Sequence, residues 1–179
     1  MRMLTKAAAL PWGLIDSCSE TNRDDSFDLG SGVDTASGQA ILLKKQALIG
    51  TVKFYLKKFN FSSPTGNAVS KIYRAQGTIG LDAVPITTTP VLATSDTFDV
   101  STLSDSYQLI TFTFSPSVWI SNSKIVVAVE YSGGGGGDYV SSGTDHSSPT
   151  NPGNVVRRNS SGTWMALSTH DSIFYLYSS

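Results

Sequence analysis

The sequence predicts an all-β protein, an antiparallel β-sandwich of the jelly-roll type with an extended N-terminal arm. Three observations support this fold class. Apolar and polar residues alternate along most segments after residue 40, as they do in strands with one buried face. Turn-forming residues separate these segments at short spacing, and no segment after the arm shows apolar residues at a helical period. Charged residues make up only 15% of the chain, which is low for a helical enzyme.

The chain is expected to form one domain behind the arm, because 179 residues are enough for a single sizeable core. We place the arm at residues 1–30 and the sandwich domain at residues 31–179. The start of the arm is basic and then apolar, but Pro11 interrupts the apolar run, so the match to a secretory signal is poor. Terminal segments become ordered by docking. We therefore expect apolar arm residues to anchor the chain on a partner: Leu10, Trp12, Leu14 and Ile15.

The expected strands follow one another from residue 51 to the C-terminus. Each is rich in β-branched, aromatic or alternating apolar residues and is bounded by turn-forming residues. In the first strand Val52, Phe54 and Leu56 share one face, while lysine and tyrosine side chains occupy the other. The last strand also alternates and is expected to be central. The set is 51–58, 68–75, a short strand within 90–100, 107–114, 124–131, 138–143, 154–159, 163–168 and 172–179, with a single helical turn within 99–107.

Five consecutive glycines, residues 133–137, lie between two of these strands. The run is expected to be a loop at one end of the sandwich, because strong strand patterns flank it on both sides. Glycine offers no side chain for recognition and only allows the chain to turn. Any ligand contact of this loop is therefore expected from the adjacent Asp138 or Tyr139.

The charge pattern leaves two interpretations open. The net charge of −1 gives no general attraction for nucleic acid. Seven basic residues and no acidic residue lie between Thr35 and Leu81. Solvated strand faces with edge-protecting lysines explain this stretch, and so does a basic face for an anionic glycan or an acidic partner. The single cysteine, Cys18, excludes an internal disulfide, and no segment has the roughly 20 apolar residues of a membrane span.

No catalytic motif is present, so the chain is not expected to be an enzyme. Its only histidines are His146, in a loop by composition, and His170, just before the last strand. The Gly-x-Ser-x-Gly motif of hydrolases and the Lys-Ser/Thr of a phosphate loop are both absent. No cofactor is expected except calcium, for which an aspartate-rich stretch offers oxygen ligands; the alternative is a polar hinge. The candidate calcium ligands are Asp24, Asp25, Asp28 and Asp34.

Aromatic and polar side chains also suggest a glycan site. Sugars bind against aromatic faces and to polar groups on loops, and an aromatic ring beside the glycine run is a good candidate for this role. The alternative for the two tryptophans is packing in or over the core. The candidate glycan-binding residues are Tyr139, Trp119, Trp164 and Asp138.

Several segments together resemble a known β-sandwich module. They are "KFYLKKFNFSSPTGNAVSKIY", "LATSDTFDVSTLSDSYQLITFTFS" and "VVAVEYSGG", followed by "SSPTNPGN", "GTW" and "IFYLY". Modules of this kind occur in phage structural and tail proteins, in environmental viral sequences and in bacterial surface proteins, and they are similar to carbohydrate-binding or virion-decorating jelly rolls. The resemblance covers residues 39–177, with five glycines where the family pattern has one or two.

The resemblance implies a non-enzymatic virion structural protein of a tailed phage, such as a capsid decoration, a head fibre or a tail-associated protein. Its arm is expected to dock on other virion proteins, with the sandwich exposed on the particle as part of a homo-oligomer. The alternative is a carbohydrate-binding adhesin or receptor-binding module that contacts a cell-surface glycan from an extracellular or cell-surface position. Neither function implies nucleic acid as a partner.

Overall fold

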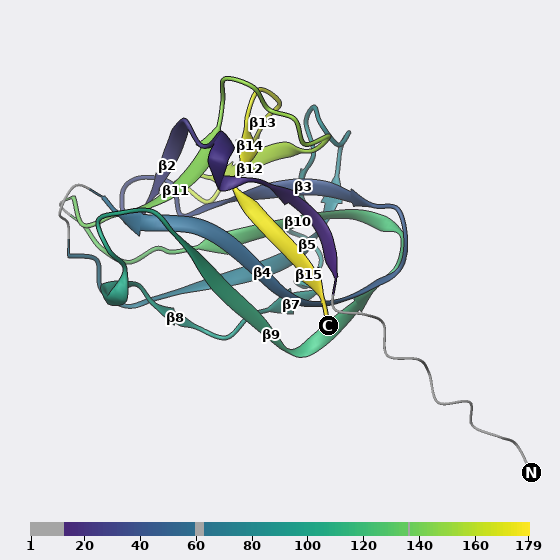
Figure 1. Cartoon of the computed structure of the whole chain (residues 1–179), viewed down its shortest axis with the longest axis horizontal. Coiled ribbons are helices and arrows are strands. Elements are labelled where there is room, and N and C mark those ends of the chain that lie inside the picture. Colours follow the sequence, from purple (N-terminus) through teal and green to yellow (C-terminus); the bar gives the residue numbers. More distant parts are fainter. Residues whose placement is uncertain (1–12, 60–62, 136) are drawn as a thin grey trace, which may run out of the picture.

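The computed structural model describes residues 13–59, 63–135 and 137–179 and shows an all-β protein with two antiparallel sheets (Figure 1). The predicted all-β class and the β-sandwich are confirmed. Two short 3-10 helices accompany the strands, η1 (Glu20–Asn22) and η2 (Val100–Thr102). The second lies where the sequence predicted a single helical turn. No helix in the described part of the chain is long and apolar enough to cross a membrane.

The seven-stranded sheet combines the first two strands of the described chain with the last two. Its strands are β1 (Leu14–Cys18), β2 (Asp25–Leu29), β4 (Ala47–Lys58), β9 (Gln108–Ile120), β11 (Val140–Asp145), β14 (Asp171–Ser172) and β15 (Phe174–Ser178). β4 is central, because it pairs with β9 on one side and with β15 and then β11 on the other. β1 lies beside β15, and β2 and β14 lie beside β11.

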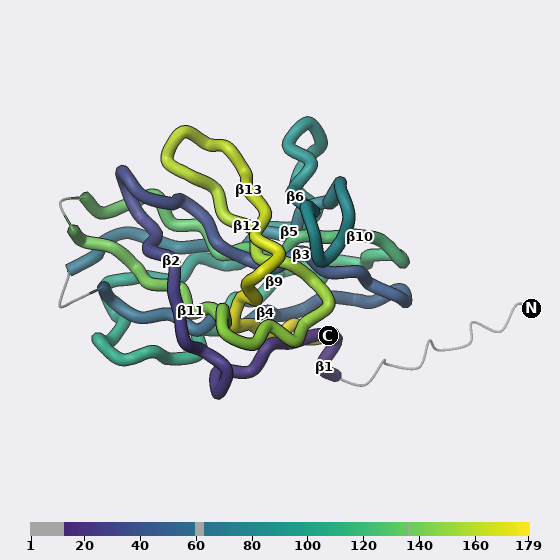
Figure 2. Tube along the Cα trace, turned by 90° about the horizontal axis from the view of Figure 1, so that it is seen from above, coloured from purple at the N-terminus to yellow at the C-terminus, as the bar shows by residue number. Residues whose placement is uncertain are grey.

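The eight-stranded sheet faces the first one. Its strands are β3 (Ala36–Leu43), β5 (Asn67–Gln76), β6 (Val84–Pro85), β7 (Ala93–Thr94), β8 (Phe98–Asp99), β10 (Ser123–Glu130), β12 (Asn154–Arg158) and β13 (Trp164–Leu167). The order β13-β12-β3-β10-β5 forms its body, and the three shortest strands pair with β5. Figure 2 shows the β12–β13 hairpin and the β6 segment projecting on the side away from β1 and the C-terminus.

Part of the segment that we assigned to the arm belongs to the sandwich. Residues 14–29, which we assigned to the arm, form β1, η1 and β2 and belong to the seven-stranded sheet. The sequence did not predict β1, because the register of this strand on β15 shifts between Leu14 and Asp16. Such an irregularity breaks the alternation of apolar and polar residues that indicates a strand. Ile15 packs against the core, whereas Leu14 is exposed. The other two expected anchoring residues, Leu10 and Trp12, lie outside the described residues.

Strand β9 is longer than the predicted strand at 107–114. It continues to Ile120 through the cis peptide bond between Ser115 and Pro116. Proline usually ends a ladder because it has no amide hydrogen to donate. Here the register on β4 shifts between Ile49 and Thr51, so Pro116 falls where the two strands exchange no partner residues.

The core lies between the two sheets and follows the alternation of the strands. Val52, Phe54 and Leu56 of β4 are completely buried, as the sequence predicted. The Phe54 ring packs edge-on against Phe112 of β9, with 6.2 Å between the ring centroids, and Phe174 of β15 lies opposite Phe54 in the ladder. A smaller apolar cluster on the outer face of the eight-stranded sheet contains Ala40, Tyr73, Ala83, Val126, Ala128 and Val156.

Phe54→Ala should lower the free energy of unfolding by about 4 kcal/mol, because the substitution leaves a cavity at a fully buried aromatic site. Urea unfolding followed by tryptophan fluorescence measures this change. Thr113→Ala, on the exposed side of β9, is the control and should change stability by less than about 0.5 kcal/mol. Equal effects of the two substitutions would contradict the central position of Phe54.

Candidate functional site

The outer face of the seven-stranded sheet carries a cluster of tyrosine and basic side chains. Strand alternation creates it, since the neighbours of these residues on β4 and β15 enter the core. The register brings them together, because Tyr175 lies opposite Lys53 and Tyr177 lies opposite Thr51. We call this surface the tyrosine face and define it by Arg23, Lys53, Tyr55, Lys57, Tyr107, Tyr175 and Tyr177.

Stacking and cation–π contacts connect the tyrosine face. The rings of Tyr55 and Tyr107 stack with 5.0 Å between centroids, and those of Tyr175 and Tyr177 with 6.4 Å. Positive charge beside aromatic rings suits a ligand that combines a flat apolar surface with anionic groups. The basic groups lie 4.7–5.5 Å from ring centroids, with Arg23 and Lys57 over Tyr107 and Lys53 over Tyr177.

A hydrogen bond fixes one side of this surface. The Tyr175 hydroxyl donates to the Glu20 carboxylate. This bond lowers the pKa of Glu20, while partial burial raises the pKa of Tyr175. A shallow depression of about 370 Å³ lies nearby on the same face, and its lining includes the exposed Leu14 together with Lys53 and Tyr177.

The two ends of the sandwich differ in character. At the terminal end, where β1 begins and β15 ends, the Gly13 amide donates to the Ser178 hydroxyl at 2.9 Å. At the loop end, β10 turns into β11. Strand β4 joins the two, since its Ile49 pairs with Ser178 and its Lys58 pairs with Val140. A strand of this length separates the ends by about 30 Å, and Figure 1 shows the C-terminus and the start of β1 together at one of them.

Exposed apolar side chains lie toward the terminal end. Trp119 is 55% exposed and pairs with Leu48 near the start of β4. Leu42 is 46% exposed beside the β3–β4 turn, and Leu14 of β1 is 55% exposed. A depression of about 630 Å³ lies at this end as well, and its lining is Ile15, Asp16, Ile41, Leu42, Leu43, Lys44, Lys45, Gln46, Ala47, Ile79, Asn151, Pro152 and Gly153.

The predicted glycan-binding residues occupy separate places. Trp119 lies at the terminal end, on the same sheet as the tyrosine face. Trp164 lies on the outer face of the other sheet, with its ring 5.6 Å from that of Tyr73. Asp138 and Tyr139 are at the loop end. The structure therefore brings no two of the three predicted aromatic residues into one platform.

The described glycines of the run, 133–135 and 137, lie in the loop between β10 and β11, as predicted, and these two strands belong to different sheets. The residues beside it hold the neighbouring β4–β5 loop. The Asp138 carboxylate accepts a hydrogen bond from the Ser63 amide at 2.8 Å, and the Tyr139 carbonyl accepts one from the Phe59 amide at 3.0 Å. The Tyr139 ring also packs 6.0 Å from the Phe59 ring. These contacts give both predicted residues a structural role.

The four predicted calcium ligands do not converge on one point. Three of them have different partners, and only Asp25 belongs to a cluster of potential metal ligands in the described residues. Hydrogen bonds from Ser147 and from the His146 amide lower the pKa of Asp24. The partners are the His146 and Ser147 amides for Asp24, the Ser141 hydroxyl for Asp28 and the Arg157 guanidinium for Asp34.

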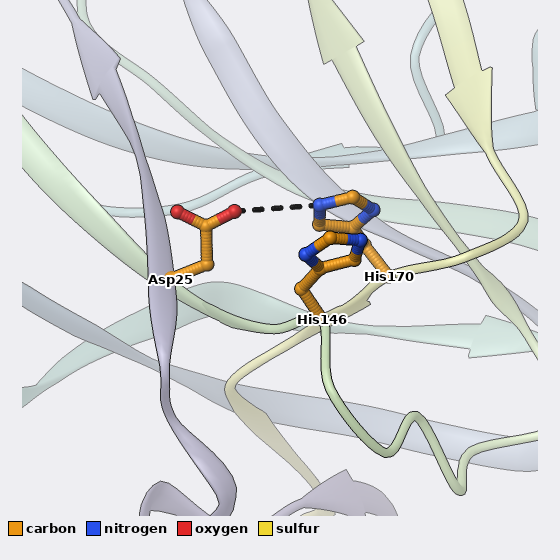
Figure 3. Close-up of side chains that lie close together, drawn as sticks. All are labelled: Asp25, His146 and His170. Atoms are coloured by element: carbon orange, nitrogen blue, oxygen red, sulfur yellow. Dashed lines mark ion pairs between the residues drawn. The ribbon is translucent and has the colours of Figure 1, made fainter.

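His146 and His170 meet at an edge of the sandwich, beside Asp25 (Figure 3). Their rings stack with 4.1 Å between centroids and an interplanar angle of 6°. His170 Nε2 lies 3.4 Å from Asp25 Oδ2. One ligand atom from each of the three residues lies within 4.8 Å of the others, and no second group of this kind occurs in the described part of the chain.

Two buried aspartates adjoin these histidines in the sequence. Asp145 and Asp171 pair between β11 and β14, and both are completely buried. Burial raises the pKa of Asp171, against the effect of its hydrogen bonds from the Asn151 amide and the Gln39 amide group. Asp145 Oδ2 has no hydrogen-bond partner among the described residues. One carboxylate oxygen therefore lacks a hydrogen-bond donor near the two crossovers, where the chain passes from β11 to β12 and from β13 to β14 between the sheets.

Glu130 is the centre of a charge network on the outer face of the eight-stranded sheet. Its carboxylate lies 2.9 Å from Lys71 Nζ and 3.2 Å from Arg158 Nη2, and it accepts a hydrogen bond from the Tyr73 hydroxyl. Burial, with this hydrogen bond, raises the pKa of Tyr73. Glycoside hydrolysis needs two carboxyl groups across a cleft, and no other carboxylate takes part in these contacts. The network therefore suits a structural role.

Comparison with protein-family models gives no match, and comparison with curated proteins finds no similar sequence. The fold places this chain among the all-β proteins with two antiparallel sheets.

Sequence reasoning missed the tyrosine face and the histidine pair. A signal for the first was present, since Tyr55 alternates with the core residues of its strand and Tyr175 alternates with those of another. No local signal relates His146 to His170, because they lie 24 residues apart in the sequence (170 − 146). They come together only because β11, which ends just before His146, pairs with β14, which begins just after His170.

Tyr73→Phe should lower the free energy of unfolding by about 1.5 kcal/mol, because the buried Glu130 loses a hydrogen-bond donor. Glu130→Gln should cost more, about 2 kcal/mol, since Lys71 and Arg158 lose their counter-charge but remain partly hydrated. Urea unfolding measures both. Tyr177→Phe, on the outward tyrosine face, is the control and should leave the free energy of unfolding nearly unchanged. If Tyr177→Phe lowered it as much as Tyr73→Phe, the hydrogen bond from Tyr73 to Glu130 would not be the cause of the effect.

Proposed function

We propose that this chain is a non-enzymatic structural protein of a tailed-phage virion, with a jelly-roll sandwich exposed on the particle. Its role is that of a capsid decoration, a head fibre or a tail-associated protein, in homo-oligomeric form. The terminal end and the N-terminal segment make the contact with other virion proteins. The resemblance of residues 39–177 to modules of such proteins supports this proposal.

One structural observation carries the proposal. Leu14, Leu42 and Trp119 expose large apolar surfaces toward the end of the sandwich where the described chain begins and ends. We take these side chains as the points of contact with other virion proteins, because an apolar side chain that is exposed in the isolated chain becomes buried when a partner covers it. Residues 1–12 join the domain at the same end, because β1 begins at Leu14. Attachment there leaves the loop end, about 30 Å away along β4, free to face outward.

Deleting residues 1–12 should preserve the fold and reduce incorporation of the protein into particles at least tenfold. The fold should persist because this deletion ends before the first strand. Trp119→Ser should also reduce incorporation, whereas Val91→Ser, an exposed apolar residue beside β7, should not. Immunoblots of purified particles assembled with each variant measure the outcome. Full incorporation of both the deletion and Trp119→Ser would overturn this proposal.

The tyrosine face favours a second candidate function, a carbohydrate-binding adhesin or receptor-binding module. Its stacked rings offer apolar surfaces for sugar rings, and Lys53 and Lys57 add positive charge beside them. An acidic polysaccharide of a cell surface fits this combination best. Of the basic residues between Thr35 and Leu81, Lys53 and Lys57 contribute to this face, whereas Lys71 and Arg74 belong to β5 of the other sheet.

Binding to acidic polysaccharide should weaken at least tenfold, or by about 1.4 kcal/mol, in Tyr177→Ala. Lys53→Ala should give a comparable loss that shrinks at high salt, because it removes a screened charge interaction. Trp164→Ala, an aromatic change on the other sheet, is the matched control. Glycan arrays followed by calorimetry on the positive sugars provide the measurement. No signal on any acidic glycan would refute this second function and leave the virion role standing.

A further inference from the structure

We propose that Asp25, His146 and His170 form a binding site for a transition-metal ion of the zinc class. Two imidazoles and one carboxylate are donors that zinc accepts, and the remaining coordination position would hold water. Calcium prefers sites made of oxygen ligands only, so this donor set changes the expected metal as well as the expected ligands. The site is independent of the proposed virion role.

Each ligand comes from a different element at one edge of the sandwich. Asp25 begins β2, the strand beside β11. His146 follows β11, where the chain leaves the seven-stranded sheet for β12 of the other sheet. His170 precedes β14, where the chain returns from β13. The antiparallel pairing of Thr144 with Ser172 and of Asp145 with Asp171 continues in the direction of the two histidines, which explains why their rings meet.

The distance between two of the ligand atoms equals that expected around a bound metal ion, and all three ligand atoms lie within 4.8 Å of one another. In a tetrahedral site with bonds of about 2.0–2.1 Å, ligand atoms are separated by about 3.3–3.4 Å. Asp25 Oδ2 and His170 Nε2 are already 3.4 Å apart. A metal ion must lie in the plane of each imidazole that binds it, so the parallel rings must tilt apart. His146 is exposed and outside the strands, which leaves its side chain room to make this movement.

Neighbouring groups support a cation at this point. His170 Nδ1 lies 2.9 Å from the Thr169 hydroxyl, so a hydrogen bond there leaves Nε2 available on the side of Asp25. Such a partner on the second nitrogen is typical of metal-binding histidines. The His146 backbone amide donates a hydrogen bond to Asp24 Oδ1 at 2.7 Å, which holds the backbone at this position. The Cys18 thiol is buried in the core and does not belong to this group of potential ligands.

The chain offers few competing ligands for such an ion. It has only two histidines and one cysteine, and residues 1–12 contain no His, Cys, Asp or Glu. A bound ion would join the edge strand β2 to both crossovers between the sheets. Since an ion that binds only the folded state stabilises it, the metal should protect this edge against unfolding.

Zinc titration of the untagged, metal-free full chain tests the proposal. Isothermal titration calorimetry at about pH 7.5, where histidine is mostly neutral, should show one Zn²⁺ per chain. His146→Ala and His170→Ala should each raise the dissociation constant for Zn²⁺ at least tenfold. Asp25→Asn should raise it by a smaller factor. Asp105→Asn, an exposed carboxylate that is not part of the ligand group, is the matched control and should bind like the unmodified chain.

Two further measurements sharpen this test. Saturating Zn²⁺ should raise the melting temperature by roughly 5 °C in the unmodified chain and by much less in His170→Ala. The visible absorption of bound Co²⁺ should show tetrahedral coordination in the unmodified chain only. Circular dichroism without metal checks that each variant folds. Absence of zinc binding, binding that both histidine variants retain, or equal affinity for Ca²⁺ would each overturn the proposal.

Discussion

The pairing of β4 on both of its edges is the constraint on which the rest of the structure depends. β9, β15 and β11 come from distant parts of the chain, and all three take their positions from this one strand. Phe54 points from it into the core, while Lys53 and Tyr55 point to the tyrosine face. A register shift by one residue would exchange these two faces. The burial of Phe54 therefore fixes the composition of the outer surface as well as the core.

The crossovers between the sheets impose a second constraint, because they bring polar groups into a buried place. Gln39 of β3 holds this region together. Its side chain donates to Asp171 and accepts from the Ser172 amide, so it ties one sheet to the returning chain of the other. Buried polar groups are tolerated when such partners satisfy them. The same crossovers carry His146 and His170 outward to the edge, where the two rings stack.

Alternation made part of the structure predictable from the sequence. The buried face of β4 and the outward position of Tyr55 both follow from a period of two. The N-terminal strand was missed because a register shift disturbs Leu14–Cys18, and the length of β9 was missed because Pro116 is an apparent strand breaker. The site was less predictable than the fold. Asp25 was selected for calcium, but its histidine neighbours depend on long-range register that no local pattern contains.

The tyrosine face and the cluster of Asp25, His146 and His170 each take one residue from the same short segment of chain. Arg23 lies over the Tyr107 ring at 4.7 Å, and Asp25 follows it by two residues at the start of β2. The backbone that carries Arg23 therefore continues directly into the strand that carries Asp25. The tyrosine face and the histidine pair are neighbours through this segment, whereas the terminal end, built from β1, β3 and the end of β9, lies outside it.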